Sequence, residues 1–124
     1  MPFEVKQVGN EPIIVATIIP PIDTVTEPRL TGQAANEIAR RFKGTVYRIT
    51  DLTLLDLSYE ELVMGMADDI NHSEPNMEHI FVGNGDMVEL ATQSMKLPQY
   101  GAKGAQMIKS VEEAIAYARK QLNG

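Results

Sequence analysis

Residues 45–70 read TVYRITDLTLLDLSYEELVMGMADDI, the clearest structural pattern in the chain. The stretch opens with a β-branched run over Thr45–Ile49, which favours a buried strand. Ser58 and Glu61 then form a capping box, in which two side chains satisfy free backbone N–H groups at a helix start. The apolar positions that follow share one helix face: Tyr59, Leu62, Val63, Met66 and Ile70. The stretch therefore predicts a strand, a loop and a helix.

Toward the N-terminus the sequence predicts a hairpin followed by a helix. Phe3–Val8 and Pro12–Ile19 are predicted strands joined by a tight turn at Gly9, and so short a connection makes them antiparallel. A helix with Pro28 in its first turn comes next. We expect its buried stripe to be Leu30, Ala34, Ile38 and Phe42, at i, i+4 spacing.

Toward the C-terminus two short strands are predicted, each followed by a helix. The strands are His79–Val82 and Gln106–Ile108. The helix after the first is expected to use Asp86 as its cap and to turn these side chains inward: Met87, Leu90, Ala91 and Met95. Ser110 and Glu113 form another capping box before the last helix.

The element order β-β-α-β-α-β-α-β-α predicts a single α/β domain over residues 1–124, with a mixed five-stranded sheet and about four helices. The chain has no Cys, which excludes a thiol nucleophile and a Cys-ligated metal. A net charge of −6 counts against nucleic acid as a partner. Without a signal-peptide pattern or a membrane-length apolar run, we expect a cytoplasmic protein that does not bind a membrane.

Three stretches follow the pattern of a known family. They are TVYRITDLTLLDLSYEELV (residues 45–63), HIFVGNGDMVELA (residues 79–91) and AQMIKSVEEAIAYARKQL (residues 105–122). In element order and hydrophobic pattern, the chain from Glu11 to Leu122 resembles the STAS domain of sulphate transporters and anti-sigma-factor antagonists. The resemblance implies a STAS-like fold and the general role of the family, a small non-enzymatic regulatory module that binds another protein.

The phospho-switch members of that family carry an Asp-Ser pair at the start of the helix after the third strand, and a partner kinase phosphorylates the serine. The matching residues here are Asp56-Leu57-Ser58-Tyr59. Leu57 stands at the position of the target serine and Tyr59 replaces the usual glycine, so these departures count against the phospho-switch. Ser58 itself is a phosphorylation candidate, because a helix N-terminus tolerates a phosphate; the alternative is a plain helix cap.

We predict a partner-binding surface on the loop and helix start that hold Asp51, Asp56, Ser58 and Tyr59. The partner is another protein or, in a homo-oligomer, a second copy of the chain, because the first hairpin leaves a sheet edge that must be paired or protected. A contiguous apolar surface patch beside Ser58 would favour this hypothesis.

The alternative is a small-ligand or anion-binding domain whose site lies at the carboxyl ends of the parallel strands, where open α/β sheets bind ligands. Asp51, Asp56, Asn84 and Gly85 would line that site, although turn and capping roles explain the same residue types. We expect no cofactor and no metal. No complete set of acid, base and nucleophile is present, so we expect no catalytic residues and no enzyme.

Two further expectations concern ionisable side chains. Four residues are expected to give the second helix an acidic outer face, which suits solubility or a basic partner: Glu60, Glu61, Asp68 and Asp69. Asp68 and His72 are spaced like metal ligands but fit a solvated helix end better. His79 is expected to be a hydrogen-bonded strand histidine rather than a general base.

Overall fold

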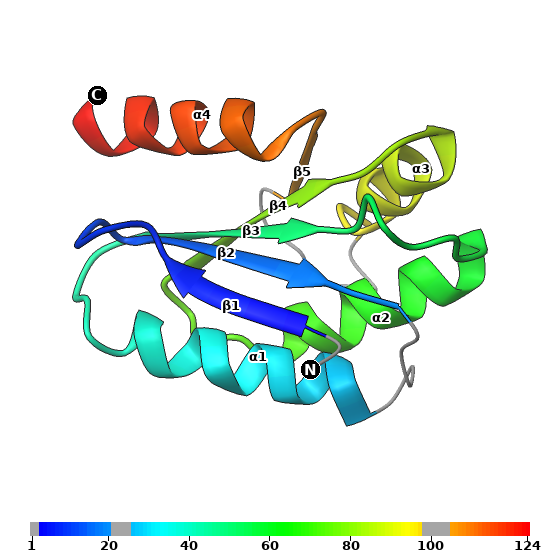
Figure 1. Ribbon diagram of the computed structural model, residues 1–124, viewed down its shortest axis with the longest axis horizontal. Coiled ribbons are helices and arrows are strands. Elements are labelled where there is room, and N and C mark those ends of the chain that lie inside the picture. The colour runs from blue at the N-terminus through cyan, green and yellow to red at the C-terminus, as the bar shows by residue number, and fades with distance from the viewer. Residues whose placement is uncertain (1–2, 21–25, 98–104) are drawn as a thin grey trace.

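The computed structural model describes residues 3–20, 26–97 and 105–124, and their elements follow the predicted order (Figure 1). The strands are β1 (Phe3–Gln7), β2 (Ile13–Ile18), β3 (Val46–Asp51), β4 (Met77–Val82) and β5 (Gln106–Ile108). The helices of the described residues are α1 (Thr26–Ala39), α2 (Tyr59–Asn71), α3 (Asp86–Ser94) and α4 (Val111–Asn123). The predicted α/β class, with a mixed five-stranded sheet and four helices, is confirmed.

The sheet has the strand order β1-β2-β3-β4-β5, so each strand lies beside its neighbour in sequence. β1 is antiparallel to β2, with Phe3 opposite Ile18, and the other pairs are parallel. Gly9 has a φ of +53°, a left-handed conformation that glycine adopts without steric cost in the β1–β2 turn. Because β2 to β5 run in one direction, their carboxyl ends meet at one edge of the domain.

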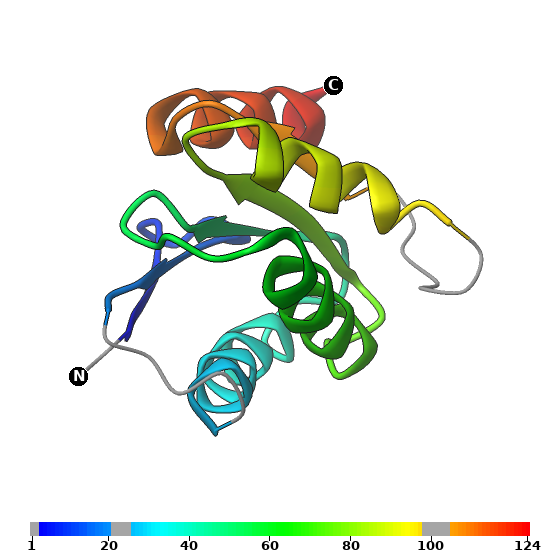
Figure 2. The same cartoon turned by 90° about the vertical axis from the view of Figure 1, so that its right-hand side faces the viewer.

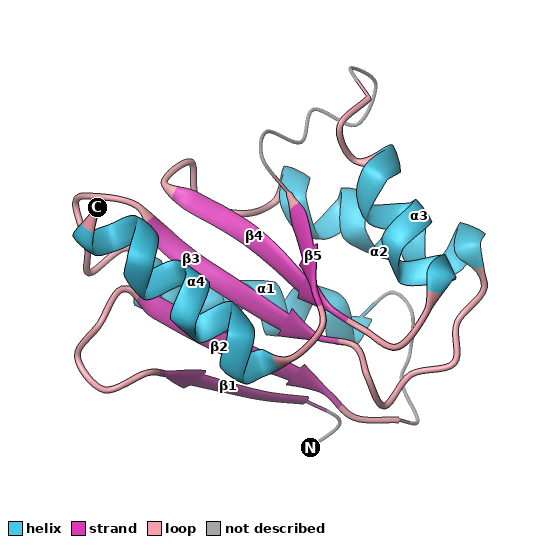
Figure 3. Ribbon diagram, turned by 90° about the horizontal axis from the view of Figure 1, so that it is seen from above, coloured by secondary structure: helices cyan, strands magenta, loops and turns pink. Residues whose placement is uncertain are grey.

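Helices cover both faces of this sheet. In Figure 1, α1 and α2 lie below the sheet and α4 lies above it, and Figure 2 shows the same layers end on. Seen from above, α4 runs across the middle strands (Figure 3). The third helix, α3, packs beside α2 and next to β5. None of the helices in the described ranges is long and apolar enough to cross a membrane.

Alternating side chains of the central strand β3 enter different cores. Tyr47 and Ile49 pack in the cluster under α4, which contains Ala114 and Ala118. Val46 packs against Ala35 and Ala39 of α1, on the opposite face. By the same alternation Arg48 and Thr50 point toward α1 and α2. The central strand therefore carries a charged side chain into an apolar layer.

The helix starts follow the predicted capping boxes. Ser58 Oγ accepts a hydrogen bond from Glu61 N at 3.2 Å, and Glu61 Oε1 accepts one from Ser58 N at 3.2 Å. Ser110 Oγ accepts a hydrogen bond from Glu113 N at 3.1 Å. Ser58 is therefore the N-cap of α2, the role given above as the alternative to a phosphorylation site.

The predicted stripe of α1 is only partly right. Ile38 and Phe42 are half-buried and pack against the core as expected, but Leu30 is 43% exposed and α1 ends at Ala39, before Phe42. The helix instead buries small side chains, including Thr31 and Ala35. Small residues let a helix lie close to the sheet, and a search for the largest apolar side chains overlooks them.

The predicted start and inward face of α3 are also partly wrong. Its cap is Gly85, with no side-chain hydrogen bond, and Asp86 is the first helical residue. Ala91 and Met95 are buried as expected, but Met87 and Leu90 are 50% and 48% exposed. The buried stripe is Val88, Ala91, Thr92 and Met95. These positions follow the helical period closely, so Met87 and Leu90 lie outside the core.

Candidate functional site

A buried ion pair connects β3 with α2. Arg48 Nη1 donates to Asp69 Oδ1 at 2.6 Å, and the two side chains are only 1% and 9% exposed. Charges at this depth are stable only when they are paired, because removal from water costs several kcal/mol for each ion. The expected place of Asp69 on an acidic outer face is therefore wrong. The sequence offered one signal for the pair, an arginine within a β-branched strand.

Glycine allows α1 to cover this pair. A Cβ atom at Gly32 would lie 3.1 Å from Asp69 Oδ1 and 4.0 Å from Arg48 Nη1. One helical turn further along, Asn36 Nδ2 donates to the backbone oxygen of His72 at 2.8 Å. The helix is thus fastened to the end of α2 while its glycine faces the ion pair.

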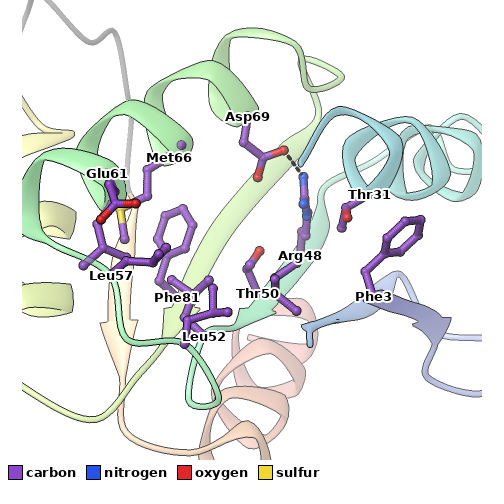
Figure 4. Close-up of a pocket in the computed structure, with 14 residues that line it drawn as sticks. Phe3, Thr31, Arg48, Thr50, Leu52, Leu57, Glu61, Met66, Asp69 and Phe81 are labelled. Atoms are coloured by element: carbon purple, nitrogen blue, oxygen red, sulfur yellow. Dashed lines mark hydrogen bonds and ion pairs between the residues drawn. The ribbon is translucent and has the colours of Figure 1, made fainter. Parts of the chain in front are cut away.

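A cavity of about 70 Å³ lies beside the ion pair, between the sheet and α2 (Figure 4). Its walls are mainly apolar side chains from several strands, α2 and the β3–α2 loop, among them Phe3, Leu52, Leu57 and Phe81. Arg48, Thr50 and Asp69 supply polar groups. This lining has the composition of a small-molecule site, but the volume is several times smaller than the roughly 300 Å³ at which drug-sized sites begin.

Among the described residues, three buried side-chain atoms have no hydrogen-bond partner: Arg48 Nε, Thr50 Oγ1 and His79 Nδ1. Arg48 and Thr50 both line the cavity. His79 lies next to Arg48 in the register of β3 and β4. Such atoms are uncommon in folded proteins, since each loses its hydrogen bonds to water without replacement.

His79 is a buried, neutral histidine. Its side chain is stacked on Phe81, and its Nε2 lies 3.0 Å from Ser73 Oγ. Burial, and then the positive charge of Arg48, lower the pKa of His79 from 6.5 to about 4, against a smaller opposite effect of Asp69. This confirms the expected hydrogen-bonded strand histidine, although it lies within β4 rather than at its start.

The structure brings together three of the four residues of the predicted ligand site. Asp56, Asn84 and Gly85 line a shallow depression of about 210 Å³ at the carboxyl ends of β3 and β4. Asp51 instead closes a turn, since its Oδ1 accepts hydrogen bonds from Thr53 N at 3.0 Å and Thr53 Oγ1 at 2.7 Å. This is the turn role that competed with a binding role for Asp51.

An apolar depression of about 460 Å³ lies between the start of α2 and the outer side of α3. We call it the α2–α3 groove, and its residues are Tyr59, Met87, Leu90, Gln93, Ser94 and Leu97. The hydroxyl of Tyr59 is hydrogen-bonded to Ser94 Oγ, which links the two helices. Ser58, the neighbour of Tyr59, is exposed at its edge. The sequence missed the α3 side because it assigned Met87 and Leu90 to the core.

The acidic end of α2 contains Asp68 and His72 in contact. His72 Nδ1 lies 2.7 Å from the backbone oxygen of Asp68 and 3.4 Å from its Oδ1. Arg29 Nη2 lies 3.5 Å from the same carboxylate oxygen. Within the described ranges, no group of three or more His, Asp or Glu side chains is placed to hold a metal ion.

Comparisons with known proteins give no relative: no family model, curated protein or solved structure matches this chain. The resemblance to the STAS family therefore stays a prediction.

Two helical glycines allow a matched test of the packing around the ion pair. Alanine is favoured over glycine in a helix by about 1 kcal/mol. A Cβ at Gly65 meets no atom within 4 Å, so Gly65→Ala should raise the free energy of unfolding by about 0.5–1 kcal/mol. At Gly32 the Cβ would press on Asp69, so Gly32→Ala should lower it by about 1 kcal/mol or more. Urea unfolding measures both, and equal stabilisation would contradict this packing.

The pKa of His79 predicts how stability depends on pH. Between pH 6.5 and about 4, His79 is protonated in the unfolded chain but stays neutral in the folded protein. The free energy of unfolding should therefore fall on acidification, by roughly 3 kcal/mol from this group. His79→Gln should remove that part of the decline, whereas His72→Gln, at a side chain that is 63% exposed, should keep it. Urea unfolding at several pH values tests this, and a decline in His79→Gln as steep as in the wild type would refute it.

Proposed function

We propose that this chain is a cytoplasmic, non-enzymatic, STAS-like regulatory module that binds another protein through the α2–α3 groove. One observation carries the proposal. Tyr59, Met87, Leu90 and Leu97 are 39% to 50% exposed around a single depression. Contiguous exposed apolar surfaces of this kind mark interaction sites, whereas scattered apolar residues do not.

The groove is partly organised before a partner arrives. The hydrogen bond between Tyr59 and Ser94 restrains the tyrosine ring and ties α2 to α3. A restrained aromatic side chain loses little conformational entropy on binding, and tyrosine is enriched among the residues that dominate interface energies. Tyr59 is therefore the expected anchor, flanked by Met87 and Leu90 of α3.

Charge around the groove indicates the chemistry of the partner. Segments 56–62 and 84–97, which build the groove and its rim, hold five acidic residues and one lysine. Glu60, Asp86 and Glu89 are exposed beside groove residues. A segment with apolar side chains and flanking basic residues complements this surface. A second copy of the chain would bring two acidic rims together, so a different protein is favoured over self-association.

Ser58 is a candidate modification site at the edge of the groove. Its side chain is exposed and caps α2. A phosphate there would add nearly two negative charges at a helix N-terminus, where the helix dipole favours them. Phosphorylation would make the rim more acidic and strengthen binding to a basic partner.

A second candidate function is binding of a small ligand at the carboxyl ends of the parallel strands. The depression lined by Asp56, Asn84 and Gly85 supports it. Asp86 lines the same depression, so two carboxylates would repel an anion there. A neutral or cationic ligand fits this site better than an anion.

A matched pair of charge substitutions tests the groove. Leu90→Glu places a carboxylate in the groove, whereas Met64→Glu changes an apolar side chain of α2 that is 73% exposed and outside it. We expect wild type and Met64→Glu to capture the same amount of a partner protein from the native cells. Leu90→Glu should capture at least about tenfold less, and a tenfold loss of affinity corresponds to about 1.4 kcal/mol. Quantitative mass spectrometry of the captured proteins measures this.

Two results would contradict the proposal. In one, Leu90→Glu and Met64→Glu retain the same proteins to the same extent. In the other, sedimentation velocity shows a wild-type dimer that Leu90→Glu dissociates, so that the groove binds a second copy. Both variants must unfold at the same urea concentration as the wild type, because a folding defect would mimic lost binding.

A further inference from the structure

We propose that the cavity beside the Arg48–Asp69 pair binds a small neutral amphiphile, a molecule with one carbonyl or hydroxyl oxygen and an otherwise apolar body. This is a binding site beyond the protein contact proposed above. The cavity and the α2–α3 groove share no lining residue, so each can be altered without the other.

Two unpartnered polar atoms point to a ligand rather than to simple packing. Thr50 Oγ1 and Arg48 Nε have no hydrogen-bond partner among the described residues, and these residues are only 4% and 1% exposed. Figure 4 shows both side chains rising from β3, with Phe81 facing them from β4. A valine at position 50 would have the same shape without the cost of an unsatisfied buried hydroxyl. A threonine is therefore useful here if its hydroxyl binds something in the cavity.

The charges around the cavity select a neutral molecule. Asp69 already neutralises Arg48 at 2.6 Å. Glu61, which lies in the first turn of α2, also lines the cavity. An anion would add a further negative charge beside two carboxylates, and a cation would meet the buried guanidinium. An uncharged oxygen adds no charge beside this ion pair, and a rotation of the Thr50 side chain lets its hydroxyl donate to that oxygen.

The size and walls of the cavity set the rest of the molecule. A space of about 70 Å³ is less than half of the roughly 150 Å³ that accommodates benzene, so it admits about three or four non-hydrogen atoms. Phe3, Ile18, Leu52 and Phe81 offer only apolar surface to it. One or two methyl groups beside the oxygen match these walls.

The α2 side offers a way into the cavity. Glu61 is exposed and Gly65 is half-buried, and both line the cavity. A Cβ at Gly65 would meet nothing within 4 Å, so the space beside this glycine is open. This is the side from which we expect a ligand to enter.

The probe for this proposal is acetone, titrated into the isotope-labelled full chain and followed by NMR. We expect saturable shifts and intermolecular NOEs from its methyl protons to Phe81 and Leu52. Acetate, the charged probe of the same size, should bind about tenfold more weakly or not at all, because a carboxylate meets Asp69 and Glu61.

Two buried threonines make matched variants. Thr50→Val should weaken acetone binding about tenfold, since it removes one hydrogen bond, and should not lower the melting temperature. Thr92→Val should leave binding unchanged, because Thr92 Oγ1 donates to Val88 O at 2.7 Å in α3, outside the cavity. Leu90→Glu should also bind acetone normally, which separates this proposal from the groove.

Three results would overturn the inference, each without reference to the groove. The first is the absence of saturable shifts at Phe81 and Leu52 in the wild type. The second is NOEs confined to Met87 and Leu90, which would place the probe in the groove. The third is a Thr50→Val variant that folds and binds acetone as tightly as the wild type.

Discussion

The ion pair between Arg48 and Asp69 is the interaction around which this domain is arranged. A charged side chain in the centre of a parallel sheet has no access to water, so α2 must supply a carboxylate and α1 must present a glycine at the same point. The long Arg48 side chain reaches the Asp69 carboxylate across the gap between β3 and α2. The shorter side chain of Thr50 points to the same side of β3, and the cavity lies beside it.

Local signals in the sequence predicted the elements, and long-range contacts decided what those elements bury. The Ser58 and Ser110 capping boxes and the β-branched strands were readable because each involves residues within a few positions. Arg48 and Asp69 are 21 positions apart, and Asp68 beside Asp69 has the same chemistry but is 35% exposed and pairs with Arg29. The two carboxylates belong to consecutive residues of α2, and the packing of this helix against β3 determines which of them is buried.

The candidate site was likewise predicted only where the signal was local. Tyr59 and Ser58 were named from sequence, but their neighbours Met87 and Leu90 were assigned to the core, since an apolar residue on a helix reads as buried until its partner face is known. Because Met87 and Leu90 are exposed near Tyr59, the three side chains line one groove. The cavity was not predicted at all, because residues of four strands, two helices and the β3–α2 loop meet there. Helix α2 joins the two sites, with Tyr59 at its start and Asp69 near its end.

The most direct test of this account is a double-mutant cycle on the ion pair, measured as the free energy of unfolding in urea. Arg48→Met and Asp69→Leu should each cost about 3–5 kcal/mol, because each leaves one buried charge without its partner. The double variant should cost far less than the sum, since no unpaired charge remains. Additive costs, or single variants within about 1 kcal/mol of the wild type as for a surface pair, would contradict the account.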